Sequence, residues 1–204
     1  KVFYATLKVH DDLVRFEVLN KSEDVNVSVE KRGNQEVLAG DIMSYDLSNI
    51  RNDSNVALEE FYLHDQLPTD AVRLGKIVTG TWSERLTYSV EYRTNKKDSY
   101  RTLASGLSSK TSHTLDCGRE ALGLAAGEYV TDIRFNFGTV QPGFHEEQKP
   151  TIYVTTLANL KSGYRIINRA DVGGRTGDEW VTAKDTWITV GWSKPKGKLP
   201  NTGN

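Results

Sequence analysis

The sequence predicts an all-β protein, an antiparallel β-sandwich with one short helix. Three observations lead to this prediction. Apolar residues alternate with polar ones in many short runs, turn-forming stretches separate the runs, and a single stretch has helical character. Alternation of this kind is typical of antiparallel sheets that bury one face. Because 37% of the residues are hydrophobic and 26% are charged, the chain can bury a core and does not have the composition of a disordered polymer.

The predicted strands follow one another along most of the chain. They are centred on residues 25–31, 43–47, 61–65, 86–92, 133–137, 152–154, 166–172 and 188–192. Turn signals such as "RGN", "LPTD", "TNKKDS", "QPG" and "VGGRTGD" lie between them. The stretch "GREALGLAAGEY", residues 118–129, is bounded by glycines and predicts the short helix.

The beginning of the chain is predicted to be a separate unit. The run "LVRFEVLNKS" alternates Val14, Phe16 and Val18 ahead of the polar stretch "KSED". We expect residues 1–23 to be the closing strand of a preceding module plus a linker, residues 24–194 to be the sandwich domain, and residues 195–204 to be a tail. An extra edge strand of the same sandwich is an equally good interpretation of the first run.

Charge and cysteine content exclude several classes of function. A formal net charge of −1 provides no attraction to nucleic acid or to an anionic membrane, so we expect neither as a partner of this fragment. A single cysteine, Cys117, excludes an internal disulfide and a multi-cysteine zinc site. We expect no cofactor and no metal. Cys117 itself is interpreted as a buried small residue rather than a nucleophile.

Three polar residues fall in phase with the apolar face of their strands. Lys31 ends the apolar parity of the first strand of the sandwich, Asp65 ends that of "FYLHD", and Asn168 follows Ile166 in phase. Singly, each has an ordinary explanation: a lysine that reaches water, an aspartate that caps a turn, an amide that satisfies the backbone. Together they place an amine, a carboxyl and a carboxamide in the core.

These three groups are the set needed for an amide cross-link between side chains. Burial disfavours the ammonium form of Lys31 and lowers its pKa, so that the free amine can attack. The same desolvation favours the protonated form of the Asp65 carboxyl, which can then share a proton with the Asn168 carbonyl and polarise it. Loss of ammonia would leave a Lys31–Asn168 isopeptide bond. Such a bond would act as disulfides act in other secreted domains.

At these residues the sequence resembles the CnaA-like, conserved-repeat β-sandwich domains of Gram-positive surface proteins and pilins. The resemblance rests on a strand with Lys31, on Gly40-Asp41, on Tyr45 and Asn49, on "DQLP" from Asp65, and on "NRADV" from Asn168. It covers most of residues 24–192. It implies an Ig-like sandwich in which the Lys, Asp and Asn carry an isopeptide bond. The first segment resembles the last strand of a CnaB-type domain.

The end of the chain resembles a sorting signal. Leu199, Pro200, Asn201, Thr202 and Gly203 match the LPxTG motif, which a sortase transpeptidase cuts between Thr and Gly. The resemblance implies that Thr202 is joined to peptidoglycan or to another pilin subunit, and that the protein is secreted and covalently anchored to the cell wall. A full signal continues into an apolar span and a basic tail, and this sequence contains neither.

We therefore expect a stalk or pilin-like domain that transmits force and is not an enzyme. The alternative is an adhesin that binds a host protein or glycan through exposed aromatic residues. Trp82 and Trp180 lie beside predicted turns and are the candidate contacts, although packing into the core or along an edge is the commoner fate of such residues. An exposed aromatic patch would favour the adhesin, and aromatic residues packed inward would favour the stalk.

Overall fold

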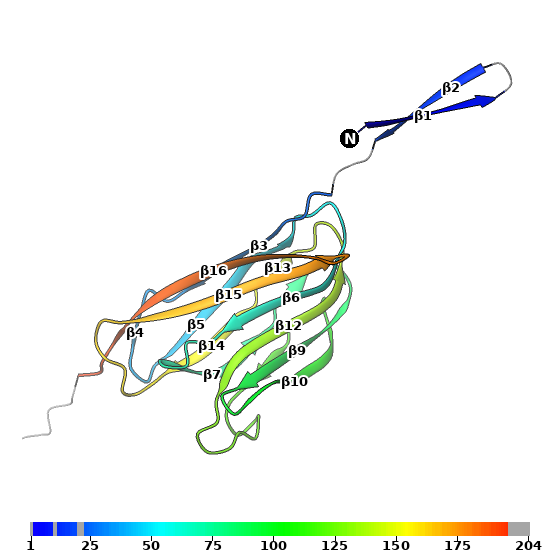
Figure 1. Cartoon of the computed structure of the whole chain (residues 1–204). Helices are drawn as coiled ribbons and strands as arrows, with labels where there is room; N and C mark the ends of the chain where they lie inside the picture. Colours follow the sequence, from blue (N-terminus) through cyan, green and yellow to red (C-terminus); the bar gives the residue numbers. More distant parts are fainter. Residues whose placement is uncertain (1, 10–11, 20–22, 196–204) are drawn as a thin grey trace, which may run out of the picture.

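The computed structural model describes residues 2–9, 12–19 and 23–195 and is built from β-strands joined by turns, with no helix among those residues (Figure 1). The strands are β1 Val2–Val9, β2 Asp12–Leu19, β3 Val27–Gly33, β4 Glu36–Leu38, β5 Ile42–Asn52, β6 Leu58–Gln66, β7 Val72–Val78, β8 Thr81–Trp82, β9 Thr87–Thr94, β10 Lys97–Ser108, β11 Thr114–Asp116, β12 Val130–Val140, β13 Glu146–Gln148, β14 Thr151–Thr156, β15 Tyr164–Thr176 and β16 Glu179–Trp192. Across the described ranges, no helix is long and apolar enough to cross a membrane.

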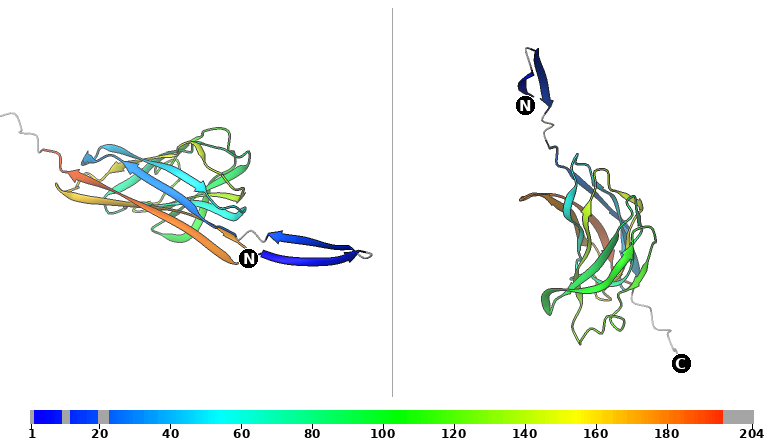
Figure 2. Two further views of the ribbon diagram at one scale, coloured as in Figure 1. Left: turned by 90° about the horizontal axis from the view of Figure 1, so that it is seen from above. Right: turned by 90° about the vertical axis from the view of Figure 1, so that its right-hand side faces the viewer.

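Two sheets face each other and form the sandwich (Figures 1 and 2). One has seven strands in the order β10-β9-β12-β6-β15-β16-β4, and the other has five in the order β11-β7-β14-β5-β3. The neighbouring strands of both sheets are antiparallel except for β16 and β4, which are parallel. The prediction of an antiparallel sandwich is confirmed.

The N-terminal segment forms its own sheet. β1 and β2 pair with each other along their whole length, from Val2 opposite Leu19 to Val9 opposite Asp12. Within the described residues neither strand pairs with a strand of the sandwich. The domain boundary at residue 23 and its assignment to a preceding module stay predictions.

The alternation predicted from the sequence is what fills the core. Inward residues of the two sheets form one hydrophobic cluster between the layers. At one end it is dominated by aromatic rings, with Trp82 stacked on Phe144 at 5.5 Å and edge-on to Phe137 at 4.5 Å. Trp82 is fully buried, so truncating it would cost about 3–5 kcal/mol of stability.

A β-bulge in β5 reverses the parity of that strand. Met43, Tyr45 and Leu47 point inward, but beyond Asn49 the inward positions are Ile50 and Asn52. Asn49 supplies the extra residue and has a left-handed backbone with φ of 50°. The register between β3 and β5 shifts at the same place. Without the bulge, the apolar residues at one end of β5 would face away from the core.

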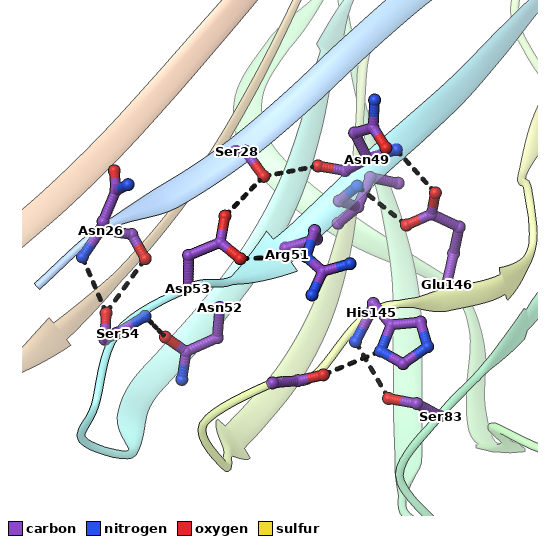
Figure 3. Close-up of polar contacts among 12 residues, drawn as sticks. Asn26, Ser28, Asn49, Arg51, Asn52, Asp53, Ser54, Ser83, His145 and Glu146 are labelled. Carbon is purple, nitrogen blue, oxygen red and sulfur yellow. Dashed lines mark hydrogen bonds and ion pairs between the residues drawn. The ribbon is translucent and has the colours of Figure 1, made fainter.

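Hydrogen bonds from side chains hold this bulge (Figure 3). The two carboxylate oxygens of Glu146 accept from the backbone N–H groups of Asn49 and Ile50, at 2.6 and 2.8 Å. The Ser28 hydroxyl donates to the Asn49 carbonyl at 2.8 Å and contacts Asp53 at 3.0 Å. Because Ser28 belongs to β3, the network also fixes where β3 pairs along β5.

The predicted short helix at residues 118–129 is wrong, because this stretch is a series of turns. One helix-like bond forms, from the Leu122 N–H to the Gly118 carbonyl at 3.1 Å. Gly123 and Gly127 then adopt left-handed backbones, with φ of 60° and 70°. A left-handed residue cannot continue a right-handed helix, so the glycines that bound the stretch end it after a single turn.

The first prediction concerns Glu146. Glu146→Ala should lower the free energy of unfolding by about 1–3 kcal/mol, because two backbone donors at the bulge lose their partner. Urea denaturation measures the change. Glu147→Ala is the matched control, since its carboxylate contacts only the half-exposed Lys110, at 3.2 Å, and its loss should cost less than about 1 kcal/mol. Equal effects of the two substitutions would contradict this role for Glu146.

Candidate functional site

Lys31 and Asp65 meet inside the sandwich. Lys31 lies on β3 of the five-stranded sheet, and Asp65 lies on β6 of the seven-stranded sheet. Their side chains are 0% and 1% exposed, and Lys31 Nζ is in direct contact with Asp65 Oδ2. The pair therefore bridges the two layers with no access to water.

Asn168 lies on the same inner surface. It is on β15, two residues before Ala170, which pairs with Asp65 of the adjacent strand. Because side chains alternate along a strand, Asn168 and Ala170 face the same way, toward the core. Asn168 is 0% exposed, and neither its amide nitrogen nor its carbonyl oxygen has a hydrogen-bond partner. A buried carboxamide without partners costs free energy, which marks this position as unusual.

Tyr45 lies close to both the Lys31 amine and the Asn168 carboxamide. Lys31 Nζ lies 4.7 Å from the centre of the Tyr45 ring. The Tyr45 hydroxyl approaches Asn168 and Thr189 but does not reach hydrogen-bond geometry with either. Burial, followed by the negative charge of Asp65, raises the pKa of Tyr45, so the hydroxyl stays protonated beside the site. All three residues predicted from the sequence are thus buried in the part of the core around Tyr45.

Burial shifts the protonation equilibrium of Lys31 toward the neutral amine. Burial lowers the pKa of Lys31 from its usual 10.5, although the charges of Asp65 and Asp185 and the hydrogen bond to Asp65 oppose that effect. A lysine amine without its proton is a nucleophile, and Asp65 is the group in contact with it that can exchange that proton. The arrangement is chemically suited to attack on the neighbouring carboxamide.

Side chains of β16 bind the edge strand β3 and the residue that follows it, beside Lys31. β3 is an edge strand, and it packs against β15 and β16 of the facing sheet (Figure 1). Asp185 Oδ2 accepts from the Lys31 backbone N–H at 2.7 Å. The Trp187 indole and the Thr189 hydroxyl donate to the Asn34 carbonyl at 3.0 and 2.7 Å. These contacts give partners to backbone groups along an otherwise unpaired edge. No local sequence pattern predicts these contacts, because they form between β3 and β16, which are far apart in the chain.

The remaining predicted residues lie elsewhere. Trp82 packs inside the core and has no exposed face, whereas Trp180 is 54% exposed on β16. The sorting-signal residues 199–203 lie outside the described residues. Burial, followed by the charge of Asp116, raises the pKa of Cys117 to about 12, so its thiol is not a nucleophile at neutral pH.

A second polar cluster, on the outer face of the seven-stranded sheet, was not predicted. His64 bridges two carboxylates, with Nδ1 2.6 Å from Asp171 and Nε2 2.7 Å from Asp132. Arg93 also binds Asp132, at 2.8 Å. Burial disfavours the imidazolium, but the hydrogen bonds and charges of the two aspartates outweigh it and raise the pKa of His64 to about 9. The alternation of β6 does place His64 opposite in parity to Asp65, but nothing local identifies partners on β12 and β15.

Comparisons with known proteins give a structural likeness and no match in sequence. No family model matches the chain, and no curated protein matches it. Among solved structures, the chain is similar to the 35 kDa C-terminal fragment of the major pilin GBS80 of Streptococcus agalactiae. The TM-score is 0.40 at 10% sequence identity, over 84% of this chain and 56% of that chain. The chain thus spans little more than half the length of that fragment, and a likeness of this extent does not establish a shared function.

The second prediction concerns pH. The folded-state pKa of His64 is raised from 6.5 to about 9, so its contribution to stability is complete below pH 6.5 and is lost as the pH rises through about 9. The free energy of unfolding, measured by urea denaturation across this window, should therefore fall more steeply in the unmodified protein than in His64→Gln. Parallel profiles for the two proteins would show that the imidazolium is not stabilised by Asp132 and Asp171.

Proposed function

We propose that residues 24–194 form a stalk or pilin-like domain of a secreted, cell-wall-anchored surface protein, stabilised by a self-formed Lys31–Asn168 isopeptide bond. The observation that carries the proposal is the buried contact of Lys31 with Asp65 beside a carboxamide that has no hydrogen-bond partner. The reaction occurs once, within one molecule, and no substrate turns over.

The proposed reaction needs only these three side chains. Within the buried pair, the Lys31 ammonium passes a proton to Asp65, and the neutral Nζ attacks Cγ of Asn168. The Asp65 carboxylic acid shares its proton with the developing oxyanion and polarises the carbonyl. The bond from Cγ to the amide nitrogen then breaks, and that nitrogen takes up the two protons that Nζ has lost, one of them through Asp65, and leaves as an ammonium ion. One C–N bond forms, one breaks, and Asp65 regains its starting state.

The position of the bond suits a domain under tension. The chain enters the sandwich through β3 at one end and leaves it through β16 at the other (Figure 1). A bond from Lys31 to Asn168 would close a covalent loop of about 137 residues, a length that would span on the order of 450 Å if pulled straight. Force applied along the chain would pass through the bond and leave that loop folded.

The proposed partners follow from the LPNTG motif at residues 199–203. A sortase would cut after Thr202 and join its carbonyl to an amine of peptidoglycan or of another pilin subunit. The motif begins seven residues after the end of the last strand, from Trp192 to Leu199, which would place this domain close to the point of attachment.

The alternative function, an adhesin, is favoured at one place. The aromatic residues that cluster around Trp82 at one end of the sandwich pack inward, as a stalk requires. Trp180 does not, and it stands beside Tyr62 on the outer face of the seven-stranded sheet. The two functions are compatible, because the cross-link faces the core and Trp180 faces outward.

The third prediction is a change in mass. If the bond forms, the purified protein should be about 17 Da lighter than its sequence, because one ammonia is lost. Lys31→Met, Asp65→Asn and Asn168→Ala should each restore the full mass of the respective sequence, and Lys31→Met should lower the melting temperature, as loss of a covalent staple does. Intact-mass spectrometry and thermal denaturation measure both effects.

Lys184→Met is the control for this experiment, since Lys184 is exposed on β16. It should keep the loss of one ammonia. A wild-type protein at full sequence mass would rule out the cross-link, and an unchanged loss in Asn168→Ala would show that another amide has reacted.

The fourth prediction concerns anchoring. Incubation with a sortase and a glycine-based amine should yield a product in which Thr202 is joined to that amine, detected by mass spectrometry of the C-terminal peptide. Thr202→Ala should abolish the product. Failure of the unmodified protein to react with sortases that process other LPxTG substrates would contradict the anchoring role and leave the cross-link unaffected.

A further inference from the structure

A hollow of about 350 Å³ lies on the outer face of the seven-stranded sheet. Its polar and aromatic lining comes from Glu60 and Tyr62 on β6, Arg134 and Asn136 on β12, and Trp180 on β16. It is separate from the buried contact of Lys31 with Asp65, which lies between the two sheets.

An aromatic platform forms one side of the hollow. The exposed Trp180 ring and the half-buried Tyr62 ring lie 6.4 Å apart at an angle of 51°. Gly173 of β15 lies between their strands, and a Cβ there would come within 2.8 Å of the Tyr62 ring and its hydroxyl. Glycine at this position therefore lets Tyr62 lie close against the β15 backbone beside Trp180.

The backbone around the hollow departs from regular pairing. Glu60 has a left-handed backbone, with φ of 52°, and Gly138 on the neighbouring strand has φ of 72°. The register shifts at Gly138 between β12 and β6, and again between Gly173 and Arg175 along β15. Bulges redirect side chains and interrupt a flat sheet surface, and strained residues gather at functional sites. Here the pairing of β6 with both of its neighbouring strands is irregular at the same level.

The charges around the hollow are already paired. Glu91 accepts from Arg134 at 2.9 Å and from Asn136 at 2.7 Å. Arg175 binds Glu60 at 3.2 Å, on the other side. A free phosphate, sulfate or cation would find no unpaired opposite charge here.

We propose that this hollow binds a neutral carbohydrate, one or two pyranose rings at the end of a glycan. The apolar face of a sugar ring would pack on Trp180, and its hydroxyls would bond to Glu60, Arg134 and Asn136. Planar polar side chains beside an exposed indole suit a ligand that is apolar on one face and rich in hydroxyls at its rim. The volume admits a ligand of that size and no extended chain. The site rests on the alternative adhesin function and deepens it by naming the class of ligand, and it does not depend on the cross-link.

The test uses the full chain with its tryptophan indoles labelled for NMR. Titration with the methyl glycosides of glucose, galactose, mannose and N-acetylglucosamine should shift the Trp180 indole signal saturably for at least one of them, and the buried Trp82 should not respond. Trp180→Ala should weaken that binding by roughly tenfold or more, and Asn136→Ala should weaken it as well. Trp192→Ala is the matched control, because Trp192 is also exposed, at 40%, but lies at the far end of β16. It should bind as the unmodified protein does.

Three results would overturn the proposal: no saturable shift with any of the four glycosides, equal shifts after Trp180→Ala, or binding only to a sulfated or sialylated probe. Lys31→Met, which removes the proposed cross-link, should bind the same glycoside with unchanged affinity at a temperature where it is folded. Loss of the cross-link and loss of sugar binding are therefore distinguishable.

Discussion

The contact between Lys31 and Asp65 is the constraint on which the rest of the sandwich depends. An amine and a carboxyl buried between two sheets each cost free energy unless they are paired with a hydrogen-bonding partner. Because Lys31 comes from one sheet and Asp65 from the other, their pairing fixes how the two layers align. A slip of β3 by one residue would turn Lys31 outward and leave Asp65 alone in the core. The hydrogen bond from the Lys31 backbone to Asp185 holds β3 against that slip.

Bulges let long strands keep a buried face at both ends. In β5 the extra residue at Asn49 changes which parity faces the core, and Glu60 does the same in β6. On the inner side this keeps the core continuous along strands of nine and eleven residues. On the outer side, the irregularity at Glu60 opens the hollow beside Trp180. The bulge at Glu60 thus keeps the core continuous on one face of the sheet and shapes the surface of the other.

In strand β6 the sequence pattern predicts which face of the sheet a residue occupies but not the residues that it contacts. Its alternation predicts that Asp65 faces inward, and the structure places Asp65 there, in contact with Lys31. The same alternation predicts that His64 faces outward, but its partners Asp132 and Asp171 are far away in sequence and come together only when β12 and β15 pair with β6. Periodicity reports which face a residue occupies. It carries no information about which strand will lie alongside.

The sequence alone determined eight strands of the sandwich, the in-phase positions of Lys31 and Asn168, and the match of residues 199–203 to LPxTG, because each depends on residue type and spacing within a short segment. It did not predict the long strands β7 and β10. The tertiary structure decided what meets across the layers and what is exposed. Trp82 and Trp180 both lie beside turns, yet one is buried among phenylalanines and the other stands in solvent. An indole is stable in either environment, so its position is set by the neighbours that long-range strand pairing brings to it.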